Sequence, residues 1–201
     1  MKVLRRSNAF AKQRGFTLIE VLVAVLVLLL GLLGMAGVQV RATQAEFESY
    51  QRKQALILLQ DMVDRMQANR LVAACYAITA VGGSPFAGTN AAGASATASL
   101  PACTFGSTEA KLVANDDLSK WSDELFGAAE TIGTSNVGAM NRARGCVVDN
   151  GSGSYTISIA WLGTAPTAPP PAALNCGTGL YGNESLRRVV SATLQVATLL
   201  P

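Results

Sequence analysis

The 201-residue chain contains no histidine, and its four cysteines form no C-x-x-C pair. Without histidine, the ordinary Ser-His and Cys-His pairs of nucleophilic enzymes are excluded. A zinc site would lack its usual closely spaced cysteine and histidine ligands for the same reason. Zinc binding is therefore a weaker interpretation of the four cysteines than disulfide formation. We therefore expect no enzyme, no metal site and no cofactor.

Two carboxylate pairs and one glycine-rich stretch are the remaining features that resemble catalytic or ligand-binding sites. The pairs are Asp116 with Asp117 and Asp123 with Glu124. We expect them on an exposed helix face, where solvated charge is the ordinary interpretation. Residues 151–153, Gly-Ser-Gly, are expected to form a turn, because no helix that could hold a phosphate begins after them.

Charge is absent from one long stretch of the chain. Residues 21–38 carry no charged and no strongly polar side chain. As a helix, residues 16–38 would span about 34 Å at ~1.5 Å per residue, enough for a hydrocarbon core of ~30 Å. We therefore predict a transmembrane helix over residues 16–38.

Acidic residues are absent from the first 15 positions, which form a basic leader. Its five basic residues are Lys2, Arg5, Arg6, Lys12 and Arg14. Positive charge stays in the cytoplasm, so the N-terminus is expected inside and Arg41 onward outside. Without these five, the chain's 16 basic and 13 acidic residues, net +3, become 11 and 13, net −2. The basic balance therefore gives no reason to expect a nucleic-acid partner.

One carboxylate, Glu20, lies at the start of the apolar run. A charged group costs roughly 2.5–3.5 kcal/mol at the centre of a membrane helix. A carboxylate in such a segment therefore suggests a function that depends on a partner for its charge. A secretory signal is cut after an apolar run of about 7–15 residues. The junction of Gly15 and Phe16 instead precedes the run. A cut there would retain the helix and create an α-amino group that could pair with Glu20 of a neighbouring subunit.

The sequence R-G-F-T-L-I-E at positions 14–20, directly before a long apolar helix, resembles the type III signal of type IV pilins and pseudopilins. In that family a prepilin peptidase cuts after the glycine and methylates the new N-terminal phenylalanine. The resemblance implies cleavage between Gly15 and Phe16, N-methylation of Phe16, and a role for Glu20 in subunit register. It also implies an α+β fold, the pilin-like lollipop, in which a long N-terminal helix packs on a small antiparallel β-sheet.

The same helix is expected to continue past the membrane as an amphipathic half over residues 39–70. No proline or glycine occurs between Val38 and Gly82. Apolar side chains recur there every three or four residues, and we expect this stripe to pack against the chain's own sheet. The stripe consists of Phe47, Tyr50, Ile57 or Leu58, Met62 and Met66, with Gln54 as a polar interruption.

Residues 71–201 are expected to form a globular α+β head. Its first part, to Leu100, is rich in small residues and predicts a surface loop. A short amphipathic helix is predicted next, capped by Asn115 or Asp116 and ended by Gly133, with Trp121 in the core.

The strands of the head are predicted from alternation and turn signals. Residues 145–162 predict a β-hairpin around the turn-rich segment 149–153. The side chains at 155, 157, 159 and 161 are expected on one face and those between them on the other. A last strand is predicted from Arg188 to about Leu199.

All four cysteines lie in the outward-facing part: Cys75, Cys103, Cys146 and Cys176. An oxidising compartment favours disulfides there. Four cysteines allow three pairings, among which the sequence does not choose. We favour Cys75 with Cys103 and Cys146 with Cys176, because each bond would close a flexible insertion.

Distal segments narrow the resemblance to the PilV family of minor pilins. The similar segments are residues 117–121, 144–148, 155–161 and 187–190 and the helix segment 29–36. This resemblance implies a minor pilin that is processed by prepilin peptidase and primes pilus assembly. The implied partners are other minor pilins, the major pilin and the inner-membrane assembly platform. The implied location is the bacterial inner membrane, with a periplasmic head, and later the pilus.

Two alternatives remain open at this point. The nearer is a minor pseudopilin of a type II secretion system or of a competence pilus, since the N-terminal signal is common to all of these. The more distant is a membrane-anchored periplasmic binding domain that is never cut or polymerised.

Overall fold

The computed structural model describes residues 15–80, 82–128, 131–133, 135–136 and 140–197. Apart from Gly15, the predicted leader lies outside the described residues. Contacts divide the chain into an N-terminal unit that ends at Gln44 and a C-terminal unit that begins at Ala45. The two units are described separately.

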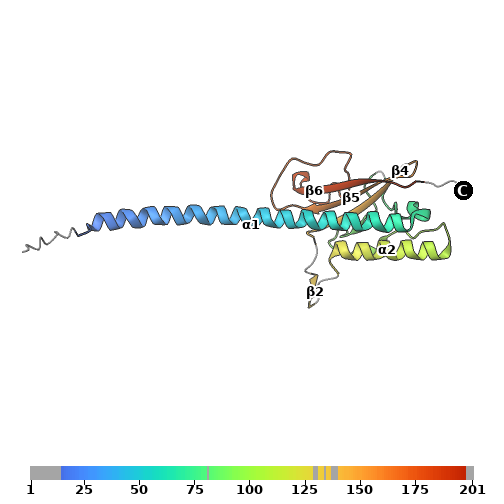
Figure 1. The fold of residues 1–201 in the computed structure, drawn as a ribbon, viewed down its shortest axis with the longest axis horizontal. Coiled ribbons are helices and arrows are strands. Elements are labelled where there is room, and N and C mark those ends of the chain that lie inside the picture. Colours follow the sequence, from blue (N-terminus) through green and yellow to red (C-terminus); the bar gives the residue numbers. More distant parts are fainter. Residues whose placement is uncertain (1–14, 81, 129–130, 134, 137–139, 198–201) are drawn as a thin grey trace, which may run out of the picture. The chain divides into compact units, whose positions relative to one another are not determined.

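The longest element is the helix α1, Leu18–Ala68, which has 51 residues (Figure 1). All of its residues in the N-terminal unit are exposed. In the C-terminal unit one face is covered, and six of its side chains are buried: Gln51, Ala55, Leu58, Leu59, Met62 and Met66. The later part of the predicted stripe is confirmed at Leu58, Met62 and Met66, whereas Phe47 and Tyr50 are exposed at 44% and 58%. The early part of that prediction is wrong.

The buried face of α1 is displaced from the predicted stripe toward Gln51 and Ala55. The small side chain of Ala55 is completely buried. Gln51 is also buried, and its Oε1 accepts a hydrogen bond from the Asn141 N–H at 3.0 Å. This face is buried because the small Ala55 allows neighbouring elements to approach closely and because the Gln51 amide has a hydrogen-bond partner. A pattern of large apolar residues could not predict it.

The second helix, α2, is Thr108–Phe126. It begins earlier than predicted, because Ser107 is the N-cap and its hydroxyl accepts from the Ala110 N–H. It also ends earlier, at Gly127, which has φ 77° and the left-handed conformation that favours glycine. The predicted bounds, from Asn115 or Asp116 to Gly133, are wrong. Burial of Trp121 is confirmed.

A four-stranded antiparallel sheet has the order β1-β4-β5-β6. Its strands are β1 Ala87–Gly88, β4 Arg144–Gly151, β5 Ser154–Leu162 and β6 Arg187–Gln195. The predicted hairpin and last strand are confirmed, although β6 ends before Leu199. β1 lies in the segment predicted as loop, and a two-residue strand is too short for its sequence to show alternation.

Short elements connect these parts. They are the 3-10 helices η1 Arg70–Tyr76, η2 Thr97–Ser99 and η3 Glu184–Leu186, and a two-stranded sheet of β2 Thr131–Ile132 and β3 Ser135–Asn136. Ile132, where the predicted helix would have ended, lies in β2 and is 72% exposed.

The main core lies between the buried face of α1, α2 and one face of the sheet. Trp121 is completely buried, and its indole N–H donates to the Leu58 carbonyl at 2.9 Å, which joins α2 to α1. A second cluster of Cys146, Ala160, Cys176 and Tyr181 is also buried. The side chains at 155, 157, 159 and 161 of β5 belong to the main core, and Ala160 lies on the opposite face of the strand. The sheet therefore buries side chains on both faces. A long helix with a small antiparallel sheet confirms the α+β pilin-like class.

Two disulfides join Cys75 to Cys103 and Cys146 to Cys176, with Cα–Cα distances of 5.1 and 5.8 Å. The first ties η1 to the segment before α2. The second ties β4 to the connection between β5 and β6. Each disulfide joins an irregular segment to a helix or a strand. The irregular segment has no regular backbone hydrogen bonds of its own to hold it in place.

Candidate functional site

The start of α1 is built by Thr17. Its carbonyl accepts from the N–H groups of Glu20 and Val21 at 3.1 and 3.3 Å, and its hydroxyl lies 3.4 Å from the Glu20 nitrogen. These contacts make Thr17 the N-cap, and T-L-I-E at positions 17–20 has the spacing of a capping box. The helix therefore begins two residues after Phe16.

The predicted processing junction lies just outside this cap. Phe16 is 84% exposed, and Gly15 is exposed as well. A Cβ built on Gly15 would meet no atom within 4 Å. The packing of the described residues therefore does not require glycine at this position, and a requirement for it would come from an enzyme that binds the junction.

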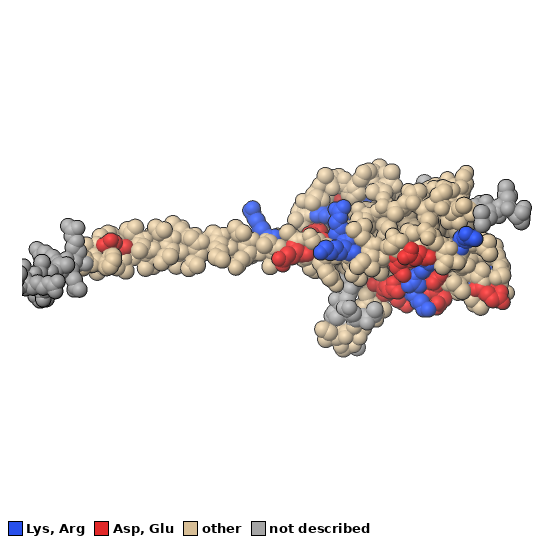
Figure 2. All heavy atoms as spheres, viewed as in Figure 1, with Lys and Arg blue, Asp and Glu red and all other residues tan. Residues whose placement is uncertain are grey.

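Glu20 lies in the first turn of α1, where a carboxylate is favourable to the helix dipole. Within residues 15–44, Glu20 and Arg41 are the only charged side chains. They are 21 positions apart, which corresponds to about 31 Å of helix at ~1.5 Å per residue. Among the described residues, none forms a hydrogen bond or ion pair with the Glu20 carboxylate. Figure 2 shows the nearly uncharged surface of the N-terminal part of α1.

The surface between these two charges is apolar and uncovered. One 18-residue window of α1 has a mean hydropathy of 2.9, and none of it is buried. By length and composition this helix can cross a membrane. Gly31, Gly34 and Gly37 have open space where a Cβ would stand. Small residues of this kind allow close approach of other helices in a membrane.

A charged cluster joins the helices of the C-terminal unit. Arg65 on α1 pairs with Asp61 at 2.7 Å, and with Asp117 and Glu124 on α2 at 3.1 and 3.0 Å. The Tyr76 hydroxyl donates to Asp117 at 2.5 Å. Burial, together with the hydrogen bond to Asp117, raises the pKa of Tyr76. Burial and then the Asp61 carboxylate raise the pKa of Glu124.

This cluster corrects the prediction for the carboxylate pairs. The Asp117 side chain is only 16% exposed and binds α1, so it is not a solvated surface charge. Asp116 does lie on the surface, where it pairs with Lys120. Asp123 accepts from the Thr97 hydroxyl. These contacts hold α1, α2 and their neighbours together, and the residues therefore have a structural role.

Two buried arginines were not found from the sequence. Arg144 is completely buried, donates to the Asn90 carbonyl at 2.9 Å, and lies 4.7 Å from the Tyr181 ring centroid. Arg187 is 2% exposed and pairs with Glu184 at 2.6 Å. Both fix loops around the second disulfide, and no local pattern marks an arginine as buried. In the part of the chain that the structure describes, no group of three potential metal ligands occurs.

Two family models match the chain. The prokaryotic N-terminal methylation motif matches residues 10–36, and type IV pilin Tt1218 matches residues 37–112. Together the matches span residues 10–112, about half of the chain. Searches of curated proteins and of solved structures each gave no match.

The matches fit the geometry of the N-terminal unit. A prepilin motif in front of an exposed apolar helix implies processing by prepilin peptidase and assembly with other pilins. It also gives a single-pass inner-membrane anchor, with the C-terminal unit in the periplasm. Type IV pilins are structural proteins, so the chain is not an enzyme. The chain belongs to the type IV pilin superfamily.

Proposed function

We propose that this pilin is a minor pilin of the PilV type that primes the assembly of type IV pili in a complex with other minor pilins. The observation that carries the assembly role is the isolated Glu20 carboxylate on an exposed apolar helix. In this proposal Gly15 and Phe16 flank the peptidase cut, and Phe16 becomes the N-methylated first residue.

The physical role of Glu20 follows from its surroundings. A carboxylate without a partner is costly in lipid or in the apolar interior of a filament. The α-amino group of a processed Phe16 is positively charged and would lie at the same end of a neighbouring helix. Pairing of Glu20 with that group satisfies both charges only at one axial stagger, so it selects the register of subunits. The apolar surface supplies non-directional burial and no register of its own.

The minor role is supported by the C-terminal part of the chain. The segments that carry the resemblance to PilV include residues 117–121 on α2 and much of β4 and β5. The disulfide of Cys146 and Cys176 closes before β6, so a whole strand follows the last cysteine. A C-terminal disulfide loop of the kind conspicuous in major pilins is therefore not formed by the described cysteines.

The first experiment determines the N-terminal mass of the protein from membranes and from sheared pili, in cells with and without prepilin peptidase. We expect a chain that starts at N-methylated Phe16 when the peptidase is present and the full leader when it is absent. We also expect small amounts in sheared pili and a loss of pili when the gene is deleted. A chain that retains residues 1–15 beside active peptidase would contradict the processing role. Normal piliation in the deletion strain would contradict the priming role.

A further inference from the structure

One guanidinium group faces three carboxylates where α1 meets α2. The Nε, Nη1 and Nη2 atoms of Arg65 lie 2.7, 3.1 and 3.0 Å from oxygens of Asp61, Asp117 and Glu124, respectively. Each nitrogen of the guanidinium therefore contacts a different acid. When all four groups are ionised, three negative charges and one positive charge leave the cluster with a net charge of −2. Figure 2 shows acidic and basic side chains gathered over α2.

The other elements that pack against α2 do not supply the missing positive charge. From η1, the Tyr76 hydroxyl donates to Asp117 and adds no charge. The strand β1 and the 3-10 helix η2 contain no charged residue. On β4, Arg144 donates to the Asn90 carbonyl, and Asp149 accepts from a backbone N–H of its own hairpin.

The charged neighbours of Glu124 on α2 itself are engaged elsewhere. Lys120, one turn before Glu124, pairs with Asp116 at 2.6 Å, and both side chains are more than half exposed. Asp123 accepts from the Thr97 hydroxyl at 2.7 Å. The excess of negative charge around Arg65 therefore has no compensation among the described residues.

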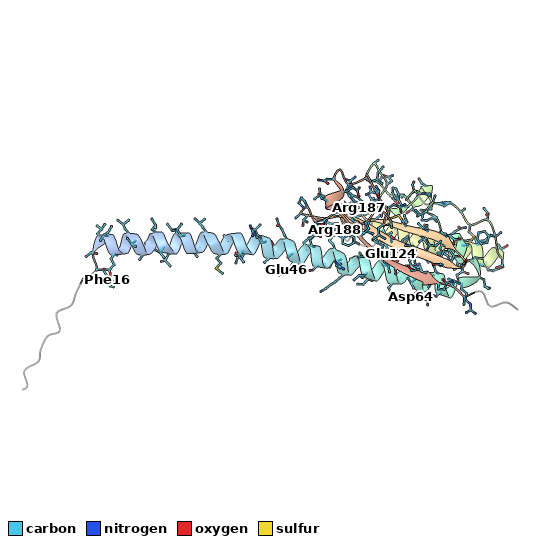
Figure 3. All side chains as sticks on the ribbon, turned by 90° about the horizontal axis from the view of Figure 1, so that it is seen from above. Phe16, Glu46, Asp64, Glu124, Arg187 and Arg188 are labelled. Carbon is cyan, nitrogen blue, oxygen red and sulfur yellow. A yellow bond between two sulfur atoms is a disulfide. The ribbon has the colours of Figure 1, made fainter. Side chains whose placement is uncertain are left out.

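Glu124 is the member of the cluster at which this excess has a measurable effect (Figure 3). Its side chain is 36% exposed, so water can deliver a proton to it. Burial and then the Asp61 carboxylate raise the pKa of Glu124, and they outweigh the opposing effect of Arg65. A proton on Glu124 also forms a hydrogen bond with Asp61. Two carboxylates that share a site favour a state in which one of them is protonated.

We propose that Glu124 and Asp61 form a proton-dependent lock between α1 and α2, which takes up one proton on acidification and then holds the two helices more tightly. The proton comes from water and resides on Glu124, so the net charge of the cluster changes from −2 to −1 while Arg65 keeps Asp61 and Asp117 as ionised partners. Histidine, the usual sensor of pH in proteins, is absent from this chain. The lock lies in the periplasmic unit and is independent of the proposed priming function.

The direction of the pH effect follows from the raised pKa of Glu124. The stabilising contribution is fully present below the ordinary value of 4.5 and is lost as the pH rises through the higher folded-state pKa. An ordinary ion pair of Glu124 with Arg65 would act in the opposite sense, because it would stabilise the fold when Glu124 is ionised. The two interpretations therefore predict opposite effects of removing the charge at neutral pH.

The test compares the full-length parent chain with Glu124→Gln in detergent, by urea unfolding between pH 4 and pH 8. Glutamine imitates the protonated carboxyl, so we expect a higher urea midpoint than that of the parent at pH 7.5 and the same midpoint below pH 4.5. The control is Glu109→Gln, an exposed carboxylate in the first turn of α2, for which no such pH-dependent difference is expected. A midpoint of Glu124→Gln that is lower than the parent's at pH 7.5, or a difference that does not change with pH, would overturn the lock.

Two further measurements locate the effect. At pH 7.5, backbone amide exchange over Thr108–Phe126 should be slower in Glu124→Gln than in the parent, and unchanged in Glu109→Gln. In the parent chain, the carboxyl carbon of Glu124, followed by nuclear magnetic resonance, should titrate above pH 4.5. Titration at or below that value, or equal exchange in all three chains, would contradict the proposal without bearing on processing after Gly15 or on entry into pili.

Discussion

The two parts of α1 differ in where their partners lie. From Leu18 to Gln44 all residues are exposed, although most are apolar, whereas the part from Ala45 to Ala68 buries six side chains in a core of its own chain. Both parts are one continuous helix. The difference teaches that a helix can be specified by its backbone hydrogen bonds and helix-forming residues while its packing partner is a membrane or another subunit.

Two carboxylates on the same helix repeat this contrast. Glu48 accepts from the Thr164 N–H and hydroxyl at 2.6 and 2.9 Å, and Arg188 lies 3.6 Å away. Glu20 has no such partner among the described residues. The chain therefore satisfies the charge of Glu48 with groups of its own C-terminal unit.

The largest effect is expected from Glu20→Ala. Membrane insertion and cleavage after Gly15 should be retained, whereas entry into sheared pili should be lost almost completely, because the register contact is removed. Immunoblots of membrane and pilus fractions measure this. Glu46→Ala is the control, since Glu46 is an exposed carboxylate on the same helix (Figure 3). Normal incorporation of Glu20→Ala would refute the register role.

Trp121→Ala should give the largest loss of stability in the C-terminal unit. It removes a completely buried ring and the hydrogen bond to Leu58, so the free energy of unfolding should fall by about 3–5 kcal/mol. Denaturant unfolding of the full chain in detergent, followed by circular dichroism, measures the change. Leu112→Ala on α2 is the control, because Leu112 is 64% exposed. Equal effects of the two variants would contradict the placement of the core.

A pair of truncations on α1 tests the contrast between its two parts directly. Met62→Ala empties a completely buried site and should cost roughly 2–5 kcal/mol of unfolding free energy. Leu29→Ala changes a residue that is 56% exposed in the N-terminal unit, and it should leave that free energy unchanged. The same detergent-based unfolding experiment compares them. A loss for Leu29→Ala as large as that for Met62→Ala would mean that the two parts of α1 do not differ as described.

The smallest effect concerns Glu184, a carboxylate with partners in its own chain. Burial alone would raise its pKa, but the Gly179 N–H at 2.8 Å and the Arg187 guanidinium outweigh burial and lower the pKa below the ordinary value of 4.5. A lowered pKa stabilises the fold above pH 4.5, and this contribution is lost as the pH falls through the folded-state pKa.

Glu184→Gln should therefore be less stable than the parent chain at pH 7, and the difference should shrink as the pH falls below 4.5 and through the lowered pKa of Glu184. Urea unfolding at several pH values measures it, with Glu109→Gln on the exposed start of α2 as the control. A difference that is the same at pH 7 and pH 3 would show that the charge of Glu184 is not the stabilising feature.

Local patterns were sufficient for several parts of the fold. The long helix, the β4–β5 hairpin and burial of Trp121 agree with the predictions, because each depends on signals within a few residues. The N-cap Ser107 was overlooked, although a serine two residues ahead of an acidic first turn is a recognisable start signal. The buried face of α1 and the short strand β1 could not be predicted, because each depends on what packs against it.

The sequence by itself determined that the first 15 residues of this pilin carry five basic and no acidic side chains, that one apolar stretch has a single carboxylate at its start, and that all four cysteines follow this stretch. These are properties of composition and order along the chain, so no folding is needed to read them. Only the tertiary structure decided that Gln51 and Ala55 are buried while Tyr50 is exposed, and that Asp117 and Glu124 bind Arg65. Those features arise from contacts between residues distant in the sequence, and shape and hydrogen bonding select them after local propensity has been satisfied.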